Sequence, residues 1–114
     1  MQGQNFLKNI DFAKVLDLES LVDYGEGKVI SRTLCQGKPL SITLFAFDKG
    51  EEVSTHSAPG DAMVYVIDGT CEVTIGGEKF LLNKGQTIVM PANIPHAVYA
   101  KERFKMLLTV VFSL

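Results

Sequence analysis

The sequence contains two histidines, His56 and His96, and each follows a glycine-containing turn signal. An imidazole ring can coordinate a transition metal, exchange a proton near neutral pH, or hydrogen-bond a ligand. Each of the two rings could equally be a structural side chain that is satisfied inside the protein. Which role applies depends on where the surrounding elements place the two rings.

Turn signals recur along the chain at the spacing expected for short strands. They lie at Asp48-Lys49-Gly50, Asp68-Gly69, Gly76-Gly77, Asn83-Lys84-Gly85 and residues 91–95. The segments 28–34, 40–47, 61–67, 71–75 and 87–90 between them are rich in residues that favour strands. Asp68-Gly69 and Gly76-Gly77 suit two-residue hairpin turns, because glycine tolerates positive φ. The pattern predicts an all-β sandwich or barrel.

Residues 104–112 are apolar at almost every position. Such a strand is expected to be covered on both faces, by the barrel core on one side and by a partner subunit on the other. One small barrel cannot easily cover both faces by itself, so we predict a homodimer.

We expect one domain, with an N-terminal arm at residues 1–26 and a barrel at residues 27–114. Apolar residues of the arm partly fit a helical stripe, and they also fit a short strand followed by one turn of helix. These residues are Phe12, Val15, Leu16, Leu18, Leu21 and Val22. Both interpretations of the arm stay open at this point.

Composition excludes several classes of function. The chain has 114 residues, 46% of them hydrophobic, and a formal net charge of −2. It has no basic cluster of the kind that binds nucleic acid or an anionic membrane surface. Residues 1–9 lack a signal-peptide pattern, and the apolar runs are too short to span a bilayer, so we expect a cytoplasmic protein. Cys35 and Cys71 lack CxxC spacing and are expected to be reduced and buried.

Residues 50–69 and 85–96 together resemble the two sequence motifs of the cupin superfamily. In the first motif His56 follows Gly50 at the family's spacing, and Gly69 closes the motif; in the second, Gly85, Pro91 and His96 match. The resemblance identifies a small single-domain cupin of the conserved-barrel type with a degenerate first motif. It implies an all-β double-stranded β-helix, or jelly-roll barrel.

The resemblance also implies a metal site with four ligands, of which this chain keeps two. His56 and His96 occupy ligand positions, while Ala58 stands at the second histidine position and Ala62 at the Glu or Gln position. A methyl group coordinates nothing, and divalent sites normally need three protein ligands. We therefore expect a divalent metal ion (Fe, Mn, Ni or Zn) to bind weakly, if at all.

Asp61 is the weaker candidate for a third ligand. It is one position out of register with Ala62, and strand side chains alternate, which predicts that Asp61 points away from the interior. A bulge at Pro59-Gly60 could reverse that direction.

The same alternation predicts a small, mostly apolar cavity. Its wall is expected to contain Ala58, Ala62, Val64, Val66 and Val98 beside the two histidines. We interpret the protein as a barrel that binds a small molecule and has an incomplete metal site. The alternative is a metal-dependent enzyme, an isomerase or oxygenase, that uses His56, His96 and a third ligand. There is no Gly-x-Ser-x-Gly elbow and no phosphate-binding glycine-rich loop.

Overall fold

The computed structural model describes residues 5–114 and is almost entirely β-structure. The elements in chain order are η1 (Leu18–Leu21), β1 (Val29–Gln36), β2 (Leu40–Phe47), β3 (Glu52–His56), β4 (Asp61–Ile75), β5 (Glu78–Asn83), β6 (Thr87–Met90), β7 (His96–Tyr99) and β8 (Phe104–Val111). The predicted all-β class is confirmed, and β2 and β6 have the predicted bounds.

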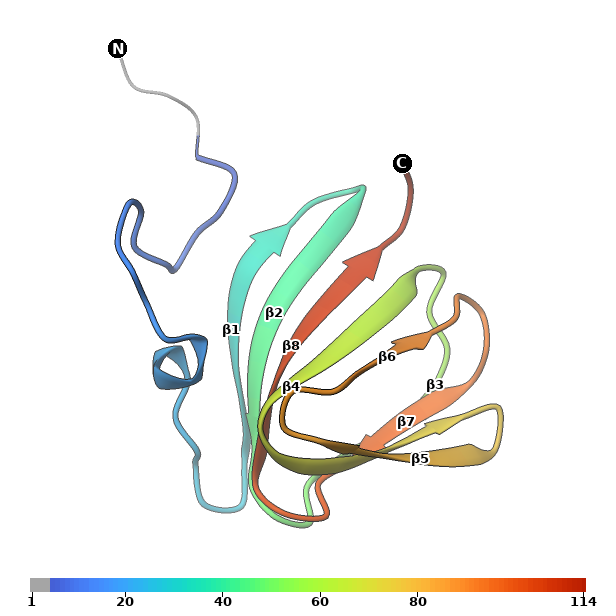
Figure 1. The fold of residues 1–114 in the computed structure, drawn as a ribbon. Coiled ribbons are helices and arrows are strands. Elements are labelled where there is room, and N and C mark those ends of the chain that lie inside the picture. The colour runs from blue at the N-terminus through green and yellow to red at the C-terminus, as the bar shows by residue number, and fades with distance from the viewer. Residues whose placement is uncertain (1–4) are drawn as a thin grey trace.

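The strands form a curled antiparallel sheet. Its order is β1-β2-β8-β4-β7-β3, and β5 and β6 also pair with β4. Figure 1 shows that β4 curves strongly, so that β1, β2, β8 and β6 lie in one layer with its first half while β5, β7 and β3 lie with its second half. This arrangement confirms the predicted jelly-roll barrel.

The predicted hairpin turn at Asp68-Gly69 is wrong, because β4 passes through these two residues and curves there. The predicted strands at 61–67 and 71–75 are one continuous strand. Its register with β8 shifts between Val66 and Asp68, and Gly69 has a φ of 74°. The positive φ therefore serves a bulge that bends the strand between the two layers. Gly76 and Gly77, with φ of 55° and 86°, do form the predicted turn, between β4 and β5.

The main core lies inside the curled sheet. Alternate residues of β4 point into it, which gives the buried and exposed pattern of residues 61–66. The fully buried side chains include Phe47, Phe104, Val64, Val66, Val73 and Cys71. The rings of Phe47 and Phe104 stack with centroids 4.6 Å apart. Val98 of β7 belongs to the same core and Val53 of β3 packs against it, so the strands that carry the two histidines are packed on this core.

The N-terminal arm forms a second apolar cluster against the opposite face of the sheet. Its described part, from residue 5, contains the single 3₁₀ turn η1 and no strand; residues 1–4 of the arm lie outside the described residues. The buried members of the cluster are Val22, Leu34, Leu44, Ala46 and Ile67, and Leu18, Leu21 and Leu107 pack against them. Lys105 Nζ donates a hydrogen bond to the Glu19 carbonyl at 2.6 Å.

This cluster changes the interpretation of residues 104–112. The outward side chain of Leu107 packs among residues of the same chain. The arm thus supplies, at this part of β8, the second cover that was expected from a partner subunit. The homodimer itself stays a prediction. No helix within residues 5–114 is long and apolar enough to cross a membrane.

Candidate functional site

A cavity of about 200 Å³ opens inside the barrel. Its wall comes from both layers of the sheet and is apolar except for two imidazole rings. The lining residues are Phe45, Val53, His56, Ala58, Ala62, Met90, His96, Val98, Met106, Leu108 and Val110. An apolar pocket with a few convergent polar groups is the usual form of a small-molecule site.

The two histidines meet across neighbouring strands. His56 is the last residue of β3 and His96 the first of β7, and they are direct partners in the antiparallel pair. Their rings are in edge-to-face contact, with centroids 4.5 Å apart and planes at 72°. His96 is only 3% exposed, whereas His56 is exposed at the rim. The pairing therefore places one ring in the wall and one at the mouth.

Backbone carbonyls fix the orientation of both rings. The Nδ1 atom of His56 lies 3.0 Å from the Ser54 carbonyl, and the Nδ1 atom of His96 lies 3.2 Å from the Ile94 carbonyl. A carbonyl can only accept, so Nδ1 carries the proton and Nε2 keeps the lone pair in each neutral ring. Burial lowers the pKa of His96, and the neighbouring His56 lowers it further. His96 is thus a neutral acceptor at physiological pH.

Three of the five apolar residues expected in the cavity line it, and two do not. Ala58, Ala62 and Val98 are in the wall. Val64 and Val66 point inward but have no exposed surface, and they pack within the main core. Side chains fill the barrel at their level, so the cavity ends before it reaches them.

Asp61 lies outside the cavity wall. Its carboxylate is exposed, and Oδ1 accepts a hydrogen bond from the Ala92 backbone N–H at 2.8 Å. The strand alternation of β4 continues through Asp61 and Ala62, with the alanine buried. The aspartate therefore ties the start of β4 to the loop after β6.

The side chains present do not fit a divalent metal ion. Within residues 5–114 no group of three or more His, Cys, Asp and Glu side chains could hold one. Ala58 and Ala62 contribute only methyl groups to the wall. Two neutral imidazoles without a third nitrogen or oxygen ligand form an incomplete site for Fe, Mn, Ni or Zn.

Several wall residues escaped the sequence analysis. They are Phe45, Val53, Met90, Met106, Leu108 and Val110. The strands that carry five of them were predicted, while β3, which carries Val53, was not. Which side chains of each strand face inward depends on the strand register. The register places Met90 and Val110 on either side of Ala62. The sequence offered one signal for these wall residues, the alternation of side chains along the strands at 40–47 and 104–112. Alternation does not show which strands are neighbours in the sheet.

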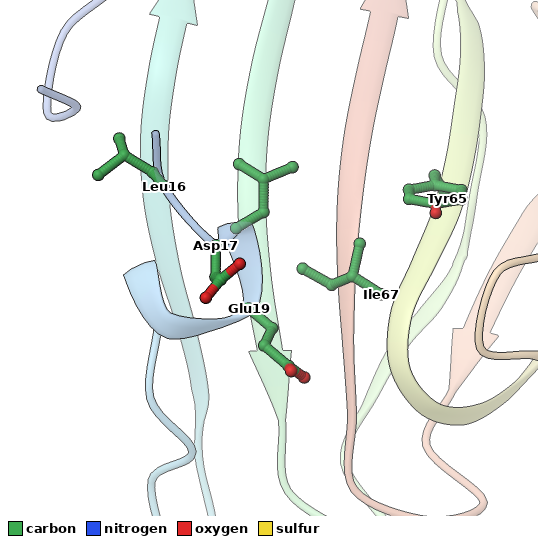
Figure 2. Close-up of a pocket in the computed structure, with 6 residues that line it drawn as sticks. Leu16, Asp17, Glu19, Tyr65 and Ile67 are labelled. Atoms are coloured by element: carbon green, nitrogen blue, oxygen red, sulfur yellow. The ribbon is translucent and has the colours of Figure 1, made fainter. Parts of the chain in front are cut away.

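A second hollow, of about 270 Å³, lies between the N-terminal arm and the outside of β4. It is lined by Leu16, Asp17, Leu18, Glu19, Tyr65 and Ile67. Figure 2 shows the two carboxylates on the arm and the Tyr65 and Ile67 side chains on β4. The lining of this second hollow contains no imidazole, so it lacks the pair of histidine side chains that distinguishes the barrel cavity.

This chain is similar to a known protein family and to several proteins of known structure. The profile of the cupin domain family matches residues 43–112. A protein of unknown function from Streptococcus pyogenes has 51% identity over 96% of each chain, with a TM-score of 0.94. A cupin superfamily protein from Desulfitobacterium hafniense has 34% identity and a TM-score of 0.89, over 94% of this chain and 98% of its own.

A third solved structure is longer than this chain. It is a cupin 2 conserved barrel domain protein from Leptotrichia buccalis, with 45% identity and a TM-score of 0.82. The similarity covers 84% of this chain and 47% of that protein. Among curated proteins, no match was found.

Proposed function

The chain belongs to the cupin domain family, and we propose that it is a barrel that binds a small molecule beside His56 and His96. The observation that carries this proposal is the apolar cavity of about 200 Å³ with two convergent imidazoles in its wall. The fold alone would not support it, because one fold hosts many functions.

The chemistry of the wall selects the class of ligand. An apolar cavity of roughly 150 Å³ accepts a ligand the size of benzene, so this one suits a single ring or a short branched chain. The Nε2 atom of neutral His96 can accept a hydrogen bond from a ligand hydroxyl or N–H. The wall contains no Lys or Arg to pair with a carboxylate. We therefore expect an uncharged, partly apolar ligand rather than a sugar acid.

Calorimetric titration with phenol and with galacturonate tests this proposal. Phenol combines an apolar ring with one hydroxyl donor, and it is expected to bind saturably, whereas galacturonate does not. Ala58→Leu should weaken phenol binding by at least about tenfold, or 1.4 kcal/mol, because it fills the cavity. Ala97→Leu, on the opposite face of β7 from Val98, is the matched control. Absence of saturable phenol binding, or equal affinities of wild type and Ala58→Leu, would contradict the proposal.

One observation favours a second function, a metal-dependent isomerase or oxygenase. Each histidine has its Nδ1 held by a carbonyl, which is the support commonly given to metal-binding imidazoles. Such an enzyme would need a third ligand from solvent or substrate. Elemental analysis separates the two functions. Metal near one equivalent that is lost in His56→Ala supports the enzyme, and no metal after incubation with iron, manganese, nickel or zinc contradicts it.

We also propose a cytoplasmic location. Cys35 and Cys71 are both free thiols, which is the usual state in a reducing compartment.

A further inference from the structure

The side chains that line the barrel cavity lie behind its rim. Five of them are each only 2% or 3% exposed, namely Ala62, Met90, His96, Val98 and Met106. His56, at the mouth, is exposed. A ligand with the size of one ring must therefore pass the rim before it contacts the buried part of the wall. The segments that form the rim determine how fast such a ligand enters and leaves.

Two loops cross between the layers of the sheet at the end of the barrel where β4 begins. Residues 57–60 run from β3 to the first half of β4, and residues 91–95 run from β6 to β7. Figure 1 shows these two loops beside each other. The first loop contributes Ala58 to the cavity wall, and the second leads directly into His96. The two crossing loops therefore form part of the rim of the cavity.

Two hydrogen bonds join the loops to each other. The Asn93 N–H donates to the Ala58 carbonyl at 2.7 Å. The Ala92 N–H donates to Oδ1 of Asp61, the first residue of β4, at 2.8 Å. The first bond joins two backbones, so the Asp61 carboxylate is the side-chain group of this link. A substitution of Asp61 can therefore change the link without changing the cavity wall.

The link lies in a weakly held part of the protein. Ser57, Pro59 and residues 93–95 are exposed, and segments with few buried contacts open locally before the whole protein unfolds. Gly60 differs, because it is buried, and a Cβ atom there would lie 2.8 Å from side-chain atoms of Val110 and Phe112. Opening therefore separates residues 57–59 from residues 91–95 while Gly60 stays packed against the end of β8.

We propose that the two loops form a gate on the barrel cavity and that the Asp61 carboxylate is its latch. The gate opens when the hydrogen bonds of Asp61 and Ala58 to the second loop break together, and a ligand then passes between the loops. This inference rests on the proposed function, because the gate regulates access to the same cavity. Asp61 itself is outside the wall, so it acts by holding the loops and not by touching the ligand.

Amide hydrogen exchange followed by NMR tests the gate without any ligand. Asp61→Ala should speed exchange of the Ala92 and Asn93 amides by roughly three- to tenfold, about the contribution of one hydrogen bond. Asn93 is the critical amide, because its own acceptor, the Ala58 carbonyl, is intact in the variant. Asp61→Asn keeps an oxygen acceptor and should restore most of the protection. Glu52→Ala, which removes an exposed carboxylate at the other end of β3, is the matched control and should change neither amide.

The Val73 amide, in the main core, reports unfolding of the whole protein. Its exchange rate should change less in Asp61→Ala than the rates of Ala92 and Asn93. Unchanged exchange of Asn93 in this variant, or an equal acceleration at Val73, would overturn the gate.

The kinetics of phenol binding give a second measurement. Because the gate lies on the path to the cavity, Asp61→Ala should raise the association and dissociation rate constants by the same factor and leave the Kd unchanged. Unchanged rate constants in a variant whose amides exchange faster would contradict the gate. Absence of phenol binding would count against the proposed function alone, because hydrogen exchange measures the latch in the ligand-free protein.

Discussion

His56 and His96 lie on different strands, β3 and β7, yet their rings are in edge-to-face contact with centroids 4.5 Å apart. Both Nδ1 atoms face backbone carbonyls, so Nε2 carries the lone pair in the neutral form of each ring. The contact arises because the antiparallel pairing makes the two histidines direct partners. The fold therefore brings together two histidines that are 40 positions apart in the sequence.

The bend in β4 depends on glycine at position 69. A Cβ atom at Gly69 would lie 1.8 Å from the Arg103 carbonyl oxygen, and φ is 74°. Gly77 has a φ of 86°, but a Cβ there meets nothing within 4 Å. We expect Gly77→Ala to cost about 1–2 kcal/mol of the free energy of unfolding, the backbone cost alone. Gly69→Ala should cost at least about 2 kcal/mol more, because overpacking is added. Urea denaturation measures both, and equal losses would contradict this explanation of the bend.

The sequence predicted the strands better than their arrangement. Alternation and turn residues located β2 and β6, because those signals are local. They could not show that Gly69 bends a strand rather than ends it, since both uses need positive φ. The histidines were found by type and spacing. Met90 was not found as a wall residue, because its position opposite Ala62 depends on a strand register that the sequence does not encode locally.

Asp48 makes stability depend on pH in the acid range. The Gly27 backbone N–H and the Arg103 guanidinium, each 2.7 Å from a carboxylate oxygen, lower the pKa of Asp48 to about 2 from an ordinary value of 3.8. As pH falls, the unfolded chain takes up this proton first. The stabilisation from Asp48 is therefore complete above about pH 4 and is lost as pH falls to about 2.

Asp48→Asn removes this contribution. We expect the variant to be less stable than wild type at pH 7, and the difference to shrink steadily between about pH 4 and pH 2. Urea midpoints across that pH range measure the difference. A difference that does not change with pH would show that the Asp48 charge does not stabilise the fold.

The two cysteines should differ in reactivity. Cys71 is fully buried, and burial raises the pKa of its thiol to about 12. Cys35 is half-buried on β1. Because the thiolate is the reactive form, iodoacetamide should modify Cys35 and leave Cys71 unmodified in the native protein. Mass spectrometry of native and denatured samples checks this, and native modification of Cys71 at the rate of Cys35 would contradict the buried position.

Part of the outer face of the sheet, formed by β4 and β6, is our candidate for the interface of the predicted homodimer. Met63 and Val89 are paired across β4 and β6 and are 43% and 50% exposed, and Tyr65 extends the same apolar face. The arm covers the Leu107 region but leaves these side chains exposed. We predict that a second copy of the chain covers them.

Light scattering at micromolar concentration should give a mass near twice the 12.5 kDa of one chain. Val89→Glu should shift the mass to that of a monomer, because it places a charge in the interface. Lys101→Glu, an exposed change in the β7–β8 loop, serves as the control. A wild-type mass of one chain would contradict the dimer.

Methionine methyl NMR tests the central claim, that the barrel cavity is a binding site, most directly. The protein is labelled with ¹³C-methyl methionine and titrated with phenol, and resonances are assigned with Met→Leu variants. Met90 and Met106 line the cavity, whereas Met63 is on the outer face. The account predicts saturable shifts of the Met90 and Met106 resonances, an unchanged Met63 resonance, and weaker binding in Ala58→Leu. Absence of saturable shifts at Met90 and Met106, or shifts confined to Met63, would contradict it.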